Sequence, residues 1–327
     1  WESLAVLIPM IDAELIAKRQ PARVLVVDDG SIRERGDGAP WGPLEAIERM
    51  EVLTLRRNLG HQRAIAIGLA YIEARLEPEA VVVMDGDGED DPRDIPRLLD
   101  RLRAEGGRKI VFAERSRRSE SSTFRVFYWL YRQAHYVLTG QRVRVGNFSV
   151  IPRRRLISLV AVAEMWNHYA AAAFRSRQPI CMIPTQRATR LRGHPTMDFI
   201  ALVTHGLSAI SVYSEVVGVR VLVLAAMLAI LSVGVMLAVV VIRLATNLAI
   251  PGWATFTISL SMILLVQAIM LTTLFSFVIL SGRNHSTFLP RRDYENYLLD
   301  IAVLFDAGRT GVGSSTASMR GQDTSDR

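Results

Sequence analysis

The sequence predicts a doubly wound α/β domain with a mostly parallel sheet, followed by a transmembrane hairpin of two helices. Two observations lead to this fold class. Apolar runs rich in β-branched residues alternate with helix-like segments through residues 1–195, and such runs are typical of strands covered on both faces. Two long runs without charge then follow within residues 221–281. At 327 residues, the chain is long enough for one sizeable domain with appended segments.

Apolar runs that end in polar turns are predicted as strands, at residues 4–8, 23–27, 52–55, 80–84 and 109–113. Helices are expected between them, at residues 43–50, 62–74 and 95–105. Because the chain begins almost directly on the first of these strands, we expect residues to be missing before it. In a doubly wound sheet, ligands bind beyond the carboxyl ends of the strands, so the site is expected in the turns that follow them.

The two uncharged runs, residues 221–242 and 253–281, are long enough to cross a membrane. As helices they would extend for about 30 Å or more, which matches the apolar core of a bilayer. The pair Pro251-Gly252 separates them. The sequence therefore predicts a hairpin with both ends on the same side of the membrane.

Charge around the hairpin predicts its orientation. Arginines flank its open end, at Arg220, Arg283, Arg291 and Arg292, and Arg243 marks the connection. Since positive charge concentrates on the cytosolic side, the large domain and the C-terminus are expected in the cytosol. The predicted parts are an α/β domain at 1–195, a juxtamembrane amphipathic segment at 196–220, the two spans at 221–281 and a cytosolic segment at 282–327.

Two further segments are predicted as amphipathic helices. Residues 124–138 interleave aromatic side chains with arginines at helical spacing, which indicates either a helix lying on the membrane or an ordinary core helix. Residues 197–213 are a second candidate, leading into the first span. Residues 308–327 are rich in Gly, Ser, Thr and charge and are predicted to be a disordered tail.

The composition is basic, with a net charge of +7 and a pI near 10.0. Such a balance fits nucleic acid, an anionic membrane or phosphorylated ligands. The arginines gather near the hairpin, so membrane lipids are an expected partner and nucleic acid is not. The one cysteine, Cys181, excludes an intrachain disulfide. It lies in the apolar run 179–184, which is predicted as a strand.

Two turns that follow predicted strands carry candidate ligand-binding residues. The strand predicted at residues 23–27 is followed by Asp28 and Asp29, whose carboxylates can accept hydrogen bonds from a base or a ribose. An Asp-Gly pair is also a common turn. Asn58 and Gly60 precede a predicted helix, and a helix start offers N–H groups to an anion. A merely capped loop is the alternative here.

A third turn, residues 85–91, holds five carboxylates in seven positions. In extended backbone Asp85, Asp87 and Glu89 point to the same side. They predict a site for Mg²⁺ or Mn²⁺, with diphosphate oxygens completing the coordination shell. A calcium loop of the EF-hand type is the rival, but a strand enters this turn and Pro92 follows it. A solvated acidic turn is the other alternative.

The ordered set VVDDGS, NLG, DGD, a basic segment and two C-terminal spans resembles glycosyltransferase family 2, which has the GT-A fold. Within it, the resemblance is to the polyprenyl- and dolichyl-phosphate sugar transferases, and it implies an integral membrane protein, with the bacterial inner membrane as the expected location. It implies that Asp28 or Asp29, with Asn58 and Gly60, contacts the nucleotide. It also implies that Asp85 and Asp87 hold the metal near Glu89. Arginines that match those neutralising phosphates in the family are Arg115, Arg187, Arg190 and Arg192.

The chain departs from this family in three places. The loop after the first strand would be shortened, because only about fourteen residues separate Pro9 from the next strand. Asn147 stands where many relatives have an Asp. The segment 190–196 lacks the Ser and Lys that usually follow its arginine.

The resemblance implies transfer of a sugar from a nucleotide-diphosphate sugar to undecaprenyl or dolichyl phosphate, by a single, metal-dependent and inverting displacement. An anionic phosphate acceptor needs positioning more than deprotonation, so an Asp at position 147 is dispensable. Arg190 and Arg192, with Asp87, are the predicted catalytic residues. His135, His168 and His194 are isolated in the sequence and are expected in structural or surface roles.

Two alternative functions and one question about assembly remain open from the sequence. A processive polysaccharide synthase would need more spans, and an inactive membrane scaffold would explain the short loop after Pro9. The small residues Ala225, Ala229 and Ser232 share one face of the first span. That face predicts either packing of the hairpin on itself or a homo-oligomer.

Overall fold

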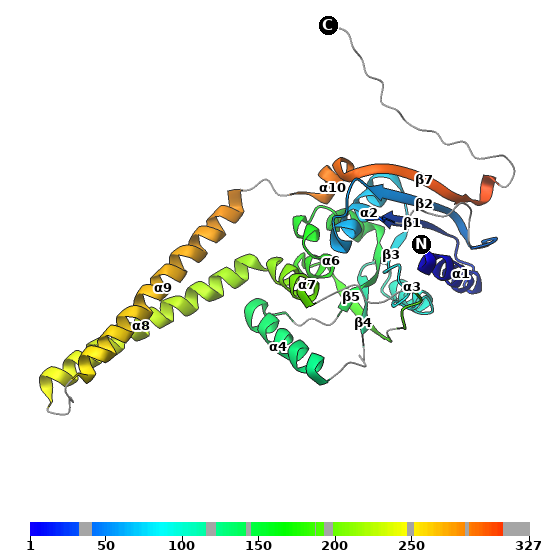
Figure 1. The fold of residues 1–327 in the computed structure, drawn as a ribbon. Coiled ribbons are helices and arrows are strands. Elements are labelled where there is room, and N and C mark those ends of the chain that lie inside the picture. The colour runs from blue at the N-terminus through cyan, green and yellow to red at the C-terminus, as the bar shows by residue number, and fades with distance from the viewer. Residues whose placement is uncertain are drawn as a thin grey trace, which may run out of the picture.

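A computed structural model describes residues 1–32, 41–115, 122–141, 145–186, 188–192, 199–246, 252–284 and 288–309. These residues form an α/β domain from which a long two-helix hairpin projects (Figure 1). The predicted α/β class and the hairpin are both confirmed. Residues 310–327, the larger part of the predicted tail, lie outside the described residues, as do Arg187 and His194.

The first element is a helix, α1 (Glu2–Ala17), and the predicted strand at residues 4–8 is wrong. The apolar residues of this segment recur at helical spacing, and Leu7, Ile8, Ile11 and Leu15 are buried. Pro9 lies inside the helix. The segment from Pro9 to β1 (Ala22–Asp28) is therefore a helix and a turn, which removes the reason given for an inactive scaffold.

The buried carboxylate of Asp12 determines where the next strand begins. It accepts hydrogen bonds from the backbone N–H groups of Glu45, Ala46 and Ile47, at 3.0, 2.9 and 2.8 Å. Strand β2 (Ile47–Leu55) starts at the last of these, so the predicted helix at residues 43–50 is wrong. A buried carboxylate with three donors has its charge satisfied, and it fixes α1 against the sheet.

The strands form two sheets of mixed direction rather than one that is mostly parallel. In the first, β1 pairs parallel with β2, and β7 (Leu298–Asp306) pairs antiparallel with β2. The second has the order β3-β5-β4-β6. Its strands are β3 (Ala80–Val83), β5 (Val145–Pro152), β4 (Ile110–Arg115) and β6 (Ile180–Thr185). Because β5 runs antiparallel to both neighbours, the expectation of a mostly parallel sheet is corrected.

Helices on the two faces of the sheets close two apolar cores. One lies under α2 (His61–Arg75) and includes Leu53, Ile67 and Phe112. The other lies under α1 and α3 (Asp94–Ala104). The predicted helices at residues 62–74 and 95–105 are thus confirmed. Shorter elements complete the domain, namely α5 (Arg153–Leu159), η1 (Ala163–Trp166) and α6 (Tyr169–Arg175).

The chain returns to the domain after the hairpin. A short helix α10 (Pro290–Asp293) and a turn η2 (Tyr294–Tyr297) lead into β7 (Figure 1). The ring of Trp166 lies 3.8 Å from that of Phe288 and 5.1 Å from that of Tyr297. Residues 290–306, predicted as part of a separate C-terminal segment, therefore belong to the sheet and its core.

The hairpin consists of α8 (Ser214–Ala245) and α9 (Trp253–Asn284). Ser214–Ala245 and Trp253–Val278 are long and apolar enough to cross a membrane, with mean hydropathies of 2.8 and 2.1. The buried residues of α8 recur every seven positions, at Gly218, Ala225, Ser232 and Val239. Small side chains at this spacing let two helices approach closely. The face predicted from Ala225 and Ser232 therefore packs the hairpin against itself, while Ala229 is partly exposed.

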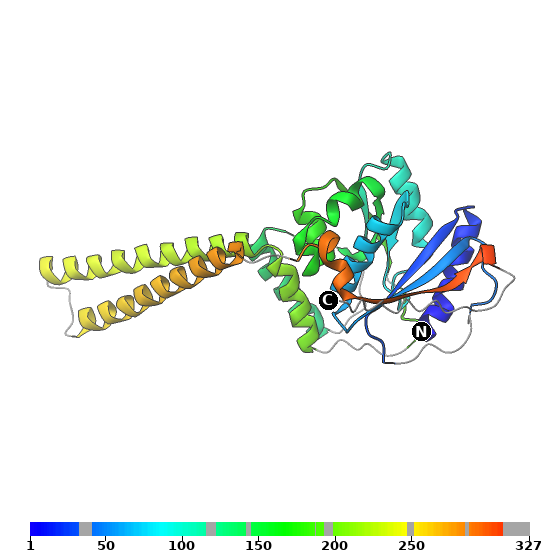
Figure 2. The ribbon, with the colours of Figure 1, turned by 90° about the horizontal axis from the view of Figure 1, so that it is seen from above.

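Two helices lie where the hairpin joins the domain (Figure 2). These are α4 (Ser122–Thr139) and α7 (Phe199–Ser211), which confirms the predicted helices at residues 124–138 and 197–213. Both expose large apolar side chains, such as Trp129 at 58% and Leu207 at 59%. Arg220 of α8 donates to the carbonyl of Val137 at the end of α4, at 2.5 Å. Contact of these helices with lipid stays a prediction.

Candidate functional site

The site begins where β1 ends. The two carboxylate oxygens of Asp29 accept hydrogen bonds from the backbone N–H groups of Leu59 (2.6 Å) and Gly60 (2.7 Å). Gly30 follows with φ +72°, and a Cβ there would lie 2.8 Å from the nitrogen of Asn58. Only glycine fits so close to this backbone. The structure thus brings Asp29, Asn58 and Gly60 together, and their expected contact with a nucleotide stays a prediction.

The two aspartates of this turn differ in what they can bind. Asp29 already has backbone partners on both oxygens, so it holds the β1 turn against the start of α2. Within the described ranges, Asp28 accepts a single hydrogen bond, from the N–H of Ser31 at 2.9 Å. A carboxylate has room for further donors. Asp28 is therefore the member of the pair with more capacity left to accept hydrogen bonds from a ligand.

The acidic turn follows β3. Glu89 N–H donates to Asp87 at 3.0 Å, and Asp85 N–H donates to the carboxylate of Asp90 at 3.1 Å. Gly88 has φ +81°, a conformation that L side chains rarely adopt. The turn is thus closed by its own acids, and the carboxylates of Asp87 and Glu89 are aimed at one cation.

That cation is Arg190. Its guanidinium lies 2.8 Å from Asp87 and 3.6 Å from Glu89. Backbone bonds hold its segment along the turn, because Ala188 N–H donates to Glu89 O and Leu191 N–H donates to Asp87 O, both at 3.0 Å. The Nε atom of Arg190 is buried and has no hydrogen-bond partner within the part of the chain that the structure describes. The neighbouring Arg192 is exposed.

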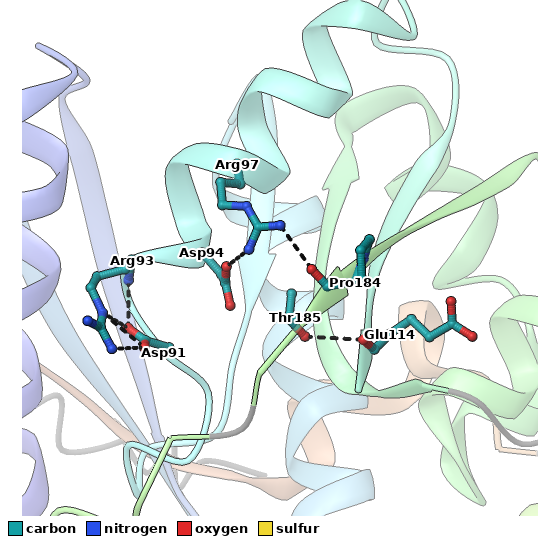
Figure 3. Close-up of polar contacts among 7 residues, drawn as sticks. All are labelled: Asp91, Arg93, Asp94, Arg97, Glu114, Pro184 and Thr185. Carbon is teal, nitrogen blue, oxygen red and sulfur yellow. Dashed lines mark hydrogen bonds and ion pairs between the residues drawn. The ribbon is translucent and has the colours of Figure 1, made fainter. Parts of the chain in front are cut away.

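The strand that precedes this segment is fixed by α3 (Figure 3). Arg97 forms an ion pair with Asp94 and donates to the carbonyl of Pro184 in β6, at 2.9 Å. Asp91, at the end of the acidic turn, is paired with Arg93, and this guanidinium lowers the pKa of its carboxyl below the ordinary value. Asp91 is therefore engaged with a neighbour outside the Asp87–Glu89 pair.

Asn147 connects the acidic turn to α2. Its amide donates to Asp85 at 3.3 Å and accepts from Gln62 Nε2 at 3.1 Å. Gln62 in turn accepts from the N–H of Tyr169 at 2.6 Å. Sequence reasoning did not single out Gln62. Its position directly after the helix-opening Gly60-His61 pair is the only signal that the sequence offers.

Three histidines from separate elements lie close together beside the hydrogen bonds of Gln62 and Asn147. The His205 ring of α7 lies 5.2 Å from that of His61 and 4.8 Å from that of His168. His168, isolated in the sequence, thus lies beside two other histidines in space, and its expected structural role is confirmed by the hydrogen bond that its Nδ1 accepts from the N–H of Ala171. His135 does have a structural role: it is buried and its Nδ1 lies 3.0 Å from the carbonyl of Gln141. Burial lowers the pKa of His135.

The environment of His168 predicts a pH dependence of stability. Burial, followed by the charges of His205, His61 and His135, lowers its pKa from 6.5 to about 3. The unfolded state then binds more protons than the folded state between these values, so stability is lost as the pH falls from 6.5 towards 3. His168→Asn should flatten this loss, while the new amide still caps α6 in place of the imidazole that accepts from Ala171 N–H.

This prediction is checked by measuring thermal unfolding of both proteins in detergent between pH 7.5 and 4.5. The wild type should lose more stability than the variant towards the acid end. Parallel curves would contradict the assignment of the effect to His168.

The described residues contain no group of three His, Cys, Asp or Glu side chains that could hold a metal ion. A magnesium site, however, commonly uses one or two carboxylates and takes its remaining ligands from phosphates and water. Asp87 and Glu89 satisfy that requirement, because they already share one cation. Asp85 is held by Asn147 beside them. These oxygen donors fit Mg²⁺ or Mn²⁺ bound together with a diphosphate.

Arg115 ends β4, on the same sheet as the acidic turn, and its side chain lies outside the described residues. The structure thus brings together the turn after β1 with Asp28 and Asp29, the acidic turn after β3, the start of α2 and Arg190.

Comparison with known proteins agrees with this arrangement. Residues 5–163 match the model of the family described as Glycosyl transferase family 2, which confirms the resemblance for this part of the chain. The matched region includes the turn after β1, the acidic turn after β3 and Asn147, and it ends before Arg190 and the hairpin.

The chain is also similar to curated proteins named undecaprenyl-phosphate 4-deoxy-4-formamido-L-arabinose transferase. Those of Yersinia enterocolitica and Serratia proteamaculans are 30% identical to it, and that of an Enterobacter species is 29% identical. Each match extends over 120 residues, which are 37% of this chain and 35% of the relative. The match thus spans about a third of the length of these relatives.

Proposed function

Taking residues 5–163 as a family 2 glycosyltransferase domain, we propose that the chain transfers a sugar from a nucleotide-diphosphate sugar to a polyprenyl phosphate at a membrane surface. The observation that carries the proposal is the acidic turn with its arginine, placed in a domain from which an apolar hairpin projects. The names of the relatives support the same class of acceptor, undecaprenyl phosphate.

On the donor side, we assign Asp87 and Glu89, beside Asp85, to a Mg²⁺ or Mn²⁺ ion that the diphosphate brings with it. Such an ion neutralises charge on a departing diphosphate. Asp28 is assigned to the nucleoside, at the turn that Asp29 fixes against Asn58 and Gly60. Arg190 is ion-paired with Asp87 and Glu89, the residues assigned to the metal. We therefore assign Arg190, together with Arg115, to binding of the donor diphosphate.

On the acceptor side, a phosphate oxygen attacks the anomeric carbon while the bond to the diphosphate breaks. One displacement inverts the configuration at that carbon. A phosphate monoester is already anionic near neutral pH, so no side chain has to remove a proton. Asn147, an amide beside Asp85 where many family members have an acid, suits this chemistry.

The proposal is tested on the full chain in detergent with a panel of nucleotide sugars and farnesyl phosphate. A sugar joined through phosphate to a prenol is released by mild acid, whereas an ordinary glycoside largely survives. An acid-labile product that forms with farnesyl phosphate and not with farnesol supports the proposal. An acid-stable product, or efficient transfer to a soluble sugar without lipid, overturns it.

The position of Arg190 predicts competition with the metal. Arg190→Gln removes the positive charge from Asp87 and Glu89, so it should tighten binding of Mn²⁺ alone by about tenfold. Electron paramagnetic resonance of free Mn²⁺, with and without inorganic pyrophosphate, measures this directly. Arg93→Gln is the matched control, because Arg93 pairs with Asp91 of the same turn. Equal Mn²⁺ affinity in wild type and Arg190→Gln would contradict the placement of Arg190.

We propose that the domain and the C-terminus face the cytosol, as the arginines around the open end of the hairpin predict. Reporter fusions after residue 309 and within the α8–α9 connection should report opposite sides of the membrane. Both reporters on one side would mean that one of the two helices does not cross.

A further inference from the structure

We infer that His61, His168 and His205 form the seat for the phosphate headgroup of the acceptor, that is, a binding site for a phosphate monoester. The inference rests on the proposed function and names a site for its second substrate. It starts from an observation that this function leaves unexplained, the convergence of three imidazoles from α2, the start of α6 and α7.

The first argument is position relative to the membrane. His205 lies on α7, which α8 follows after a short turn. Arg175 of α6 clamps that turn, since its guanidinium donates to the carbonyl of Val212 at 2.6 Å and to Glu215 at 3.0 Å. Tyr213 also donates to the carbonyl of Ala171 at 3.2 Å. A lipid whose chain runs beside α8 therefore brings its headgroup to α7.

The second argument is position relative to the donor site. His61 Nε2 lies 2.9 Å from Gln62 Nε2. Gln62 donates to Asn147, and Asn147 donates to Asp85. The imidazole cluster is thus joined to the first carboxylate of the acidic turn by a short chain of side-chain contacts. A phosphate held by the histidines lies on the membrane side of the place assigned to the donor.

The third argument is charge. The groups that act electrostatically on His168 are His205, His61 and His135, all of them bases. Adjacent imidazoles resist protonation together, and a phosphate dianion relieves this by supplying negative charge and accepting N–H bonds. Metal binding is the rival use of three histidines. Here the rings are tilted against one another with interplanar angles of 38° and 35°, and no metal-binding group of three occurs in the described part of the chain.

The fourth argument is that two described arginines near the site, Arg190 and Arg63, already have other partners. Arg190 pairs with Asp87 and Glu89, and the guanidinium of Arg63 lies over the ring of Trp166, at 4.9 Å. The guanidinium groups of Arg190 and Arg63 therefore have partners already, whereas the imidazoles of His61, His168 and His205 lie together where α2, α6 and α7 meet.

The test measures binding of farnesyl phosphate to the full chain in detergent by titration calorimetry, without donor. His205→Gln and His61→Gln should each weaken this binding by about tenfold, since each removes a charge-assisted hydrogen bond. Arg153→Gln is the control, because Arg153 pairs with Glu77 on the surface and should bind like the wild type. Inorganic phosphate and farnesol are titrated in parallel.

The outcomes separate the possible ligands. If the variants weaken the binding of farnesyl phosphate and leave the binding of farnesol unchanged, the result supports a site for a lipid phosphate. If inorganic phosphate binds as tightly as farnesyl phosphate and shows the same losses, the seat recognises free phosphate and the lipid assignment is overturned. Unchanged binding of farnesyl phosphate in both variants overturns the histidine seat alone. No binding of farnesyl phosphate to the wild type, in protein that binds Mn²⁺ with pyrophosphate, overturns the seat together with the proposed acceptor.

Discussion

Replacement of Asp87 by asparagine is expected to lower the transfer rate by roughly 10²- to 10³-fold, with folding and membrane insertion retained. The substitution keeps the volume of the side chain and removes the charge that Arg190 now neutralises and that we assign to the metal. It also keeps an oxygen for the N–H of Glu89, so the turn itself should persist. The measurement is the initial rate of sugar transfer to farnesyl phosphate at saturating metal.

Asp91→Asn is the matched control for this experiment. Asp91 belongs to the same acidic turn but pairs with Arg93, at 2.5 Å (Figure 3). An ion pair at the surface is worth about 0–1 kcal/mol, so this variant should stay within a few-fold of the wild type. Equal rates for Asp87→Asn and the wild type would remove Asp87 from the reaction. Equal losses in both variants would mean that the total charge of the turn matters and not one carboxylate.

Gly88→Ala is expected to produce the second large effect, a loss of most activity in a protein that still folds. A side chain at φ +81° costs about 1–3 kcal/mol, and the new Cβ would collide with the side chain of Leu191. Leu191 cannot move freely, because its N–H is bonded to Asp87 O. The substitution should therefore push the Arg190 segment away from the acidic turn.

Gly107→Ala isolates the backbone part of this cost. Gly107 has φ +64°, but a Cβ there meets no atom within 4 Å. Gly107→Ala should lose the backbone part of the stability alone and keep activity, whereas Gly88→Ala should lose more stability in thermal unfolding and should also lose transfer and Mn²⁺ binding with pyrophosphate. If Gly107→Ala impaired transfer equally, the contact between Gly88 and Leu191 would have no part in the site.

Elements with a clear local pattern could be predicted from the sequence. Strand β1 and helices α2 and α3 follow apolar runs or helical spacing that tertiary contacts do not override. The start of helix α1 is wrongly predicted as a strand because Leu4, Leu7 and Ile8 also fit a short apolar run. Strand β7 was missed because it is an edge strand, whose place depends on pairing with β2 across more than 240 positions of sequence.

The candidate site divides in the same way. The carboxylates of residues 85–91 follow a recognisable strand, so their chemistry could be predicted. The backbone bonds that join Asp87 and Glu89 to residues 188–191 link segments about a hundred positions apart, and no local pattern encodes them. The histidine cluster was missed for the same reason, since His61, His168 and His205 have no common spacing.

The return of the chain into the sheet after the hairpin has a mechanical consequence. A domain on a single flexible tether can swivel about it and can tilt its active site away from the bilayer. Here the chain leaves the domain through α7 and α8 and returns to it through α10 and β7 (Figure 2). The hairpin is therefore attached to the domain at two places, which together resist that rotation. The height and direction of the acidic turn above the membrane are then set by the fold. For the proposed function, this means that a lipid acceptor diffusing in the plane of the bilayer would meet a site of fixed height.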